Sequence, residues 1–171
     1  FSEVLMEQID TMSEVANAFS DFATLPIPKL VKSDLVKITR RSLEIFDGVD
    51  IRFKSSDREI KLPLDRTQWI RVITNLIQNG IQASRQGKQP KIIVNIIKKV
   101  KSVQIRFIDN GIGIPESIQS KVFEPKFTTK TKGMGLGLGI VKNIIDSHNG
   151  TIKYETGNKG TTFLVTFKIS S

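Results

Sequence analysis

Apolar positions recur at helical spacing in two long segments of the chain. In residues 1–24 they follow one another at intervals of four, three, four, three and four residues (Leu5, Ile9, Met12, Ala16, Phe19 and Ala23), which is the spacing of a coiled-coil seam. In residues 65–86 a wider stripe follows the period of an amphipathic helix (Trp69, Val72, Ile73, Leu76, Ile77 and Gly80). Asp65 is expected to be the N-cap of this helix, with Gln68 in the capping-box position.

The rest of the pattern predicts short strands between two further helices. One helix is expected at residues 32–46, and another over an apolar run that ends at Ser147. Runs of strand length lie at 49–56, 59–63, 91–99 and 103–109, and two more strands close the chain. The runs 91–99 and 103–109 are close enough to pair as a hairpin. Two prolines, Pro26 and Pro28, end the first helix and predict a semi-rigid linker.

The composition is that of a globular domain with enough apolar residues for a core and with no disulfides. The chain is 39% hydrophobic and has no cysteine, which excludes disulfides and thiolate metal sites. It shows neither an apolar run of membrane-spanning length nor a signal peptide, so we expect a cytoplasmic segment without membrane contact.

The charge is unevenly distributed along the chain. Residues 1–28 carry five acidic residues and no Lys or Arg, so all 26 basic residues follow them. A basic domain leaves nucleic-acid binding as an alternative. Because aromatic residues are few and the lysine clusters are typical of solvated faces, nucleic acid is not the expected partner.

The candidate chemistry is concentrated in residues 109–139, DNGIGIPESIQSKVFEPKFTTKTKGMGLGLG. The segment opens on Asp109 and ends on four alternating glycines just before an apolar helix (Gly133, Gly135, Gly137 and Gly139). A glycine-rich loop that enters a helix N-terminus binds phosphate, because it exposes backbone N–H groups where the helix dipole favours negative charge. The glycine spacing is neither that of a Walker loop nor that of a Rossmann fingerprint, and a plain flexible loop is the alternative.

Two asparagines lie one turn apart at the edge of the apolar stripe in residues 65–86. Asparagine is unfavourable inside a helix, because its side chain competes for backbone hydrogen bonds. Asn75 and Asn79 on one face therefore indicate a ligand or partner. The alternative is a pair of solvated amides.

Four motifs in order resemble the ATP-binding catalytic domain of sensor histidine kinases, within the superfamily of gyrase, Hsp90, histidine kinase and MutL. The stretch NLIQNGIQAS resembles the asparagine box, DNGIGIP the first glycine box, FEPKFTTK the phenylalanine-containing box and GMGLGLGI the second glycine box. The closing HNGTIKYETGNKGTTFLVTFKI resembles the last two strands of that domain, and FSDFATLPIP suggests the nitrogen-regulation subgroup.

This resemblance implies a fold and a domain organisation. The fold would be a two-layer α/β sandwich with a mixed sheet, the Bergerat-type ATP-binding fold, preceded by one coiled-coil-like helix. Residues 1–24 would be the second helix of a dimerisation stalk that carries the phosphoacceptor on another helix. Residues 25–32 would be the linker and 33–171 the catalytic domain.

The resemblance also implies roles for individual residues. Asn79 would ligate Mg²⁺, Asp109 would accept from the adenine amino group, and one of Thr161 and Thr162 would lie near the base. Lys130 and Lys132, in a mobile lid, would neutralise phosphate charge. Asn75, Asn79 and Lys130 would form the catalytic set. The implied ATP-binding residues are Asn79, Asp109, Gly111, Gly113, Ile114, Phe123, Phe127, Thr128, Thr129, Lys130, Lys132, Gly133, Gly135, Leu136, Gly137, Leu138, Thr161 and Thr162.

Asn75 stands where hydrolytic relatives carry a glutamate. An amide cannot deprotonate water, so the resemblance implies that ATP is held and its γ-phosphoryl group is passed to a histidine on a helix absent from this sequence. The alternatives are a hydrolytic ATPase and a non-catalytic nucleotide-binding module. The implied partners are the phosphoacceptor helix, a second copy joined through the stalk and a response regulator, in a parent protein anchored in the bacterial inner membrane. His148, the single histidine, is expected to be structural.

Overall fold

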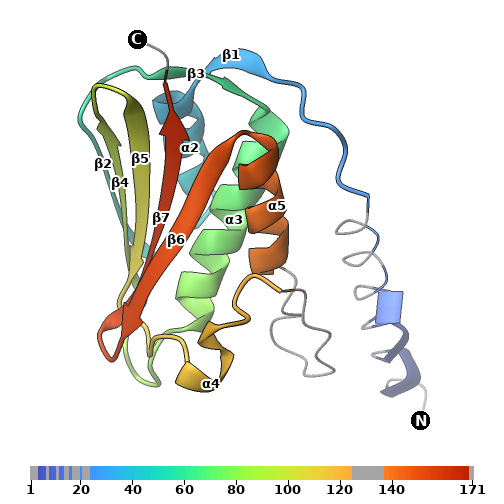
Figure 1. The fold of residues 1–171 in the computed structure, drawn as a ribbon. Coiled ribbons are helices and arrows are strands. Elements are labelled where there is room, and N and C mark those ends of the chain that lie inside the picture. The colour runs from blue at the N-terminus through green and yellow to red at the C-terminus, as the bar shows by residue number, and fades with distance from the viewer. Residues whose placement is uncertain are drawn as a thin grey trace.

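The computed structural model describes residues 4–6, 8–10, 12, 13, 16, 20, 24–124 and 137–169. One layer is a five-stranded sheet in the order β2 (Asp50–Ser55), β4 (Lys91–Lys98), β5 (Ser102–Asp109), β7 (Gly160–Lys168) and β6 (Gly150–Gly157). The helices α2 (Leu35–Leu43), α3 (Arg66–Gln82) and α5 (Gly137–Ser147) cover one face of this sheet (Figure 1). Strand β2 runs parallel to β4 and the other neighbours are antiparallel. The predicted two-layer sandwich with a mixed sheet is confirmed.

Three short elements complete the described fold. Strands β1 (Val31–Asp34) and β3 (Lys61–Leu64) pair with each other, outside the main sheet. The single-turn helix α4 (Glu116–Gln119) follows β5, and it lies at the opposite end of the molecule from β1 and β3 (Figure 1).

The core lies between the helices and the covered face of the sheet. All six residues of the predicted apolar stripe in α3 are buried (Trp69, Val72, Ile73, Leu76, Ile77 and Gly80). They meet every second residue of the central strands, for example Val94 and Ile105, which are fully enclosed. The alternation of these strands therefore sets which side chains face the helices.

The predicted hairpin of residues 91–99 and 103–109 is confirmed, because β4 and β5 pair from Ile92 with Asp109 to Lys98 with Val103. The predicted helix at 32–46 is wrong at its start. Residues 32–34 belong to β1, because the Asp34 carboxylate accepts from the N–H of Val36 at 3.0 Å and so caps the helix one residue later. Asp34 also accepts from Ile60 N–H at 3.3 Å, which holds the chain at the start of α2.

Asp65 caps α3 as predicted, with its Oδ1 accepting from Gln68 N–H at 3.1 Å. The reciprocal half of the predicted capping box is wrong. The Gln68 side chain instead donates to the carbonyl of Pro26 in the linker, at 2.8 Å. The N–H of Asp65 is satisfied by Nε2 of His148, at 3.0 Å. His148 is buried, and its predicted structural role is confirmed.

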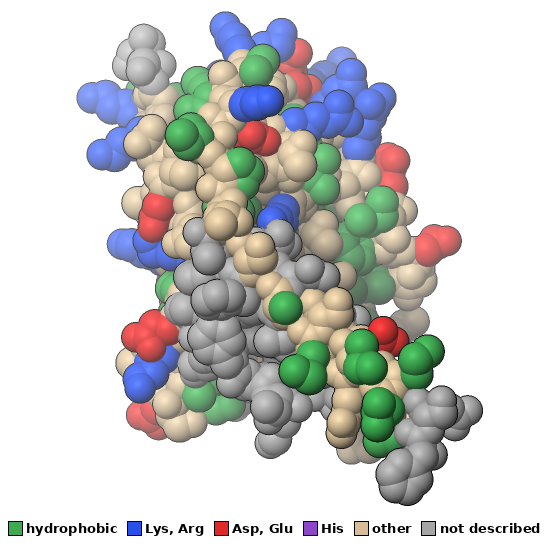
Figure 2. Space-filling view, turned by 90° about the vertical axis from the view of Figure 1, so that its right-hand side faces the viewer, with side chains coloured by type: hydrophobic (Ala, Val, Ile, Leu, Met, Phe, Trp, Pro, Cys, Tyr) green, Lys and Arg blue, Asp and Glu red, His purple; other side chains and the backbone are tan. Residues whose placement is uncertain are grey.

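The described residues of the N-terminal segment up to Ser20 are helical and exposed. They include Leu5, Ile9 and Met12 of the predicted seam, and Figure 2 shows apolar side chains gathered on this segment in the lower right of the view. After it, the linker contacts the domain through partly buried Leu25 and through Lys29 N–H, which donates to Asp65 Oδ2 at 2.8 Å. Among the described residues, no helix has the length and apolarity that crossing a membrane requires.

Candidate nucleotide site

Asp109, the last residue of β5, is held by backbone N–H groups on two sides. Its Oδ1 accepts from Gly111 N–H at 2.8 Å and from Thr161 N–H at 3.1 Å. No donor among the described residues contacts its second carboxylate oxygen, Oδ2. The side chain is therefore fixed through one oxygen, and the other remains free to accept a hydrogen bond from a ligand.

Burial raises the pKa of the Asp109 carboxyl group above its ordinary value. The hydrogen bonds from Gly111 and Thr161 act in the opposite direction but do not cancel this effect. This carboxylate is partly removed from water and has one oxygen without a partner among the described residues. It is therefore a strong acceptor for the N–H group of a ligand that displaces the remaining water.

The loop after Asp109 approaches its neighbours so closely that two positions require glycine. A Cβ on Gly111 would lie 2.6 Å from the carbonyl oxygen of Ala83, at the end of α3. A Cβ on Gly113 would lie 2.2 Å from the carbonyl oxygen of Gly157, and the φ of Gly113 is +80°. Ile114 N–H then donates to Thr156 Oγ1 at 2.8 Å. The loop is thereby tied to both α3 and the β6–β7 hairpin.

The two threonines that the sequence left as alternatives lie on opposite faces of β7. Thr161 is buried and faces the helices, and its Oγ1 lies 2.9 Å from Thr156 Oγ1. Thr162, the next residue, points to the other face of the sheet, and its backbone pairs with Ile108 of β5. The structure therefore brings Thr161 together with Asp109 and places Thr162 away from it.

The two asparagines of α3 differ in what they contact. Asn75 Nδ2 donates to the carbonyl of Arg71 at 2.8 Å, and its Oδ1 would lie 2.7 Å from a Cβ on Gly137, the first residue of α5. Asn79 has a buried Nδ2 without a partner in the described part of the chain. The next residue, Gly80, packs so closely that its Cβ would lie 3.2 Å from that of Asp109.

An unpartnered buried amide in a folded protein needs an explanation. In Asn79, the amide lies one residue from the contact between α3 and the end of β5. Its carbonyl oxygen is a hard ligand of the kind that Mg²⁺ takes, usually together with phosphate oxygens and water. The residues with described positions contain no cluster of three His, Cys, Asp or Glu side chains. If Mg²⁺ is bound here, Oδ1 of Asn79 would be its ligand beside the phosphates, while the unpartnered Nδ2, a donor, would take a phosphate or water oxygen.

Helix α5 begins at Gly137 and runs beside α3 (Figure 1). Leu138 is partly buried against the core, and Phe123 packs edge-on against Tyr154 with ring centroids 5.9 Å apart. The other residues expected in the lid and second glycine box lie outside the described residues: Phe127, Thr128, Thr129, Lys130, Lys132, Gly133, Gly135 and Leu136.

Sequence reasoning missed Thr156, which joins the Ile114 N–H to Thr161. The signal was available, because the β6–β7 hairpin pairs Gly157 with Gly160 and so sets Thr156 directly opposite Thr161. It also missed the support of α4. The Tyr154 hydroxyl donates to the carbonyl of Gln119 at 2.6 Å, and the Gln119 amide donates to that of Ile114 at 2.9 Å.

Comparison with known proteins identifies relatives of this arrangement. The model of the histidine kinase-, DNA gyrase B-, and HSP90-like ATPase family matches residues 64–171. A Rickettsia felis protein named as an NtrY-like sensor histidine kinase is 31% identical over 156 residues, which are 89% of this chain and 26% of that protein. The chain thus spans about a quarter of the length of this curated relative.

Solved structures agree with the sequence matches. The nucleotide-free catalytic domain of the histidine kinase ThkA has a TM-score of 0.72 and 32% identity, over 81% of this chain and 95% of that one. A second structure, ThkA in complex with the response regulator TrrA, has a TM-score of 0.78 and 24% identity, over 96% of this chain and 49% of that one. From the fold, the site around Asp109 and these matches, the chain belongs to the histidine kinase-, DNA gyrase B- and HSP90-like ATPase family, as a catalytic domain of the sensor histidine kinase type.

Proposed function

We propose that this domain binds ATP with Mg²⁺ and transfers the γ-phosphoryl group to a histidine on a dimerisation helix that this sequence does not contain. The family is one of ATP-binding catalytic domains. The observation that carries the proposal is the geometry of Asp109.

Asp109 combines three features that suit recognition of adenine. Its Oδ1 is held by two backbone N–H groups, and its Oδ2 has no partner among the described residues. Burial also reduces the competition between water and a ligand for this carboxylate. An adenine amino group is a donor that would satisfy Oδ2. A guanine base presents a carbonyl oxygen in the same place, which a carboxylate repels. Thr161 and Gly113 would contact the same base. Their closeness to Thr156, and through Thr161 to Asp109, supports this.

The phosphates would lie toward Asn79 and the N-terminus of α5. Asn79 would ligate Mg²⁺ through Oδ1, and its unpartnered Nδ2 would donate to a phosphate or water oxygen. Gly137 begins α5, where exposed backbone N–H groups and the helix dipole favour anions. The ion would supply charge neutralisation of the phosphates, while Asn79 holds it and the amides around Leu138 orient the phosphoryl groups.

Asn75 supports phosphoryl transfer rather than hydrolysis as the proposed reaction. Its Nδ2 is bonded to a backbone carbonyl and its amide packs against Gly137. An amide in this place offers no base for a water molecule. The domain would therefore hold ATP until a nucleophile from another helix arrives, and it would act by positioning and charge stabilisation. A hydrolytic ATPase and a non-catalytic binding module are the two competing functions.

The domain boundaries and partners belong to the same proposal. Residues 1–24 would be a stalk helix that pairs with the phosphoacceptor helix and with a second copy, because their described apolar residues are exposed. Residues 25–32 would be the linker and 33–171 the catalytic domain. A response regulator would receive the phosphoryl group in the cytoplasm, as the complex of ThkA with TrrA suggests by analogy.

The first test is calorimetry of ATP and GTP binding to this chain, with and without Mg²⁺. We expect ATP to bind, Mg²⁺ to strengthen binding, and Asn79→Ala to abolish most of the Mg²⁺ effect without loss of the fold. Gln78→Ala is a matched control, because Gln78 is exposed on the neighbouring position of α3. Equal Mg²⁺ dependence in Asn79→Ala and the parent chain would contradict the metal assignment.

The second test is incubation with labelled ATP, followed by acid and base treatment of the product. This chain should carry no phosphohistidine, since His148 is buried with both ring nitrogens in contact with backbone atoms. A chain extended upstream by the missing helix should carry acid-labile, base-stable label. A base-stable label on the present chain that His148→Gln removes would contradict the proposal.

A further inference from the structure

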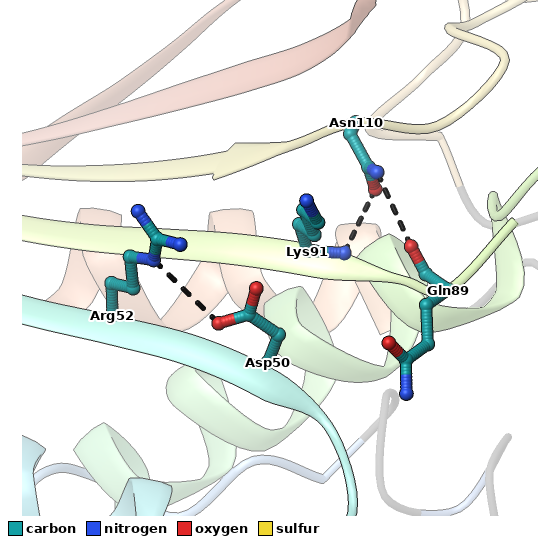
Figure 3. Close-up of polar contacts among 5 residues, drawn as sticks. All are labelled: Asp50, Arg52, Gln89, Lys91 and Asn110. Carbon is teal, nitrogen blue, oxygen red and sulfur yellow. Dashed lines mark hydrogen bonds and ion pairs between the residues drawn. The ribbon is translucent and has the colours of Figure 1, made fainter.

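Asn110, which follows the candidate adenine-binding aspartate, extends the β4–β5 ladder with its side chain. The backbone pairing of the two strands ends at Ile92 and Asp109. Beyond it, Asn110 Oδ1 accepts from Lys91 N–H at 2.9 Å, and Asn110 Nδ2 donates to the carbonyl of Gln89 at 3.3 Å (Figure 3). A carboxamide presents a donor and an acceptor as a peptide group does. The side chain therefore acts as one more rung of the sheet.

The two bonds of Asn110 lie at the ends of two interior strands, β4 and β5. The neighbouring ion pair in the same view, Arg52 with Asp50 at 3.6 Å, lies on β2 and does not include Asn110 (Figure 3). Asn110 is only partly buried. Water can therefore take over both backbone groups if the side chain is removed, and the fold does not depend on this tether.

The bonds of Asn110 to Gln89 and Lys91 also restrain Asp109, because they hold its backbone on one side. On the opposite side, a Cβ on Gly160 would lie 2.0 Å from the carbonyl oxygen of Asp109 and 3.1 Å from Cα of Asn110, so β7 closes tightly on the Asp109–Asn110 peptide. From the helical side, Gly80 approaches Cβ of Asp109. Asn110 supplies the matching restraint from the segment before β4.

The same peptide also sets the direction of the Asp109 carboxylate. Gly111 N–H, which holds Oδ1 of Asp109 at 2.8 Å, belongs to the residue directly after Asn110. If the Asn110 backbone rotates, this donor moves and the free oxygen Oδ2 turns with the carboxylate. Small displacements of a positioning group weaken a directional contact disproportionately.

We infer that Asn110 is a positioning residue for base recognition, which aims the free oxygen of Asp109 at the amino group of adenine by tying the end of β5 to Gln89 and Lys91. The inference rests on the proposed role of Asp109 in binding ATP. It predicts that selectivity for ATP over GTP depends on a side chain that touches neither the base nor the phosphates.

The experiment measures ATP and GTP affinities of this chain by calorimetry, together with amide hydrogen exchange at Lys91. Asn110→Ala should lower ATP affinity by about tenfold, within the range that one or two hydrogen bonds account for, and should change GTP affinity less. Exchange at Lys91 should accelerate. Asn110→Asp keeps the acceptor for Lys91 N–H but loses the donor to Gln89, so its selectivity should lie between those of Asn110→Ala and the parent chain.

Asn95→Ala is the matched control, since Asn95 lies on β4 on the face of the sheet turned away from the helices. It should leave both affinities unchanged. An unaltered ATP-to-GTP ratio in Asn110→Ala, with the parent chain selective for ATP, would overturn the inference alone. A parent chain without selectivity would overturn the role of Asp109 and the inference with it. Unfolding of both Asn110 variants would also overturn it, because the tether would then be a requirement of the fold.

Discussion

The backbone N–H of Asp65 donates to Nε2 of His148 at 3.0 Å, across 83 positions of sequence. Because Nε2 accepts this bond, the ring proton lies on Nδ1, which donates to the carbonyl of Ile144 at 2.8 Å. One neutral imidazole thus joins the start of α3 to the end of α5. The two helices that frame the candidate phosphate site are fastened to each other at the end remote from it.

Replacing His148 should therefore reduce stability rather than abolish nucleotide binding. His148→Ala leaves the Asp65 N–H without its partner, and an unpaired buried donor costs about 1–3 kcal/mol. The free energy of unfolding by urea measures this loss. His148→Gln, which offers an amide oxygen to the same N–H, should recover part of it. Full stability in His148→Ala would show that the bond contributes nothing.

Asp109→Asn should reduce the preference for ATP over GTP. The amide oxygen can still accept from Gly111 and Thr161, while the amide nitrogen would face the base, repel the adenine amino group and accommodate a guanine carbonyl. Stability should be maintained or rise, because burial raises the pKa of Asp109 and its charge opposes folding. Calorimetry with both nucleotides and a urea titration measure the two effects. An undiminished ATP preference in this variant would exclude Asp109 from base recognition.

Ionisation of Asp109 predicts a pH dependence of its own. A raised pKa means that the folded chain favours the protonated form of Asp109, and that the charged form destabilises the fold. The contribution of Asp109 to stability therefore falls as pH rises through the raised pKa. In Asp109→Asn this component should disappear from the stability profile.

Asp65 should behave in the opposite way. Burial raises its pKa, but hydrogen bonds from the N–H groups of Gln68, Lys29 and Thr67 outweigh this effect and lower the pKa below 3.8. A depressed pKa gives stability that is complete above the unfolded value and is lost as pH falls through the folded one.

Asp65→Asn tests this sign. The variant should be less stable than the parent chain by about 1 kcal/mol near pH 7, as expected when a helix cap loses one of its charge-assisted bonds. The difference should begin to shrink below about pH 4, near the unfolded value, and vanish only once the pH has fallen through the lowered folded pKa. Asp47→Asn, at an exposed turn, is the control and should show no such convergence. A difference that is constant from pH 2 to 7 would contradict the assignment.

Gly113 and Gly87 form a matched pair for separating backbone strain from steric contact. Their φ values are +80° and +76°, but an added Cβ meets Gly157 O at 2.2 Å in the first case and nothing within 4 Å in the second. Gly87→Ala should cost about 1–2 kcal/mol of stability, the penalty of the left-handed conformation. Gly113→Ala should cost more and should also weaken ATP binding. Equal losses in stability and unchanged ATP affinity would show that the close approach has no function.

The sequence alone determined the elements whose signal is local. The apolar stripe of α3 and the alternation of β4 and β5 follow from the periods of helix and strand, and the structure confirms them. The N-cap at Asp65 is also local, because its acceptor and its donor, Gln68, are three residues apart. The motifs around Asp109 identified the family for the same reason, since the residues that approach one ligand stand in a short ordered segment.

Only the tertiary structure decided which groups meet across the chain. It separated Thr161 from Thr162, because the pairing of β7 with β5 sets the face of each residue. It also set the hydrogen-bond partners of three side chains. Gln68 bonds to the linker and His148 to Asp65. Asn110 bonds to Gln89 and Lys91. Each of these contacts joins residues that are far apart in the sequence. The identity of an amide or imidazole residue does not reveal whether its side chain is solvated or bonded to another part of the chain. Such pairings depend on packing of the whole core, and no local pattern encodes them.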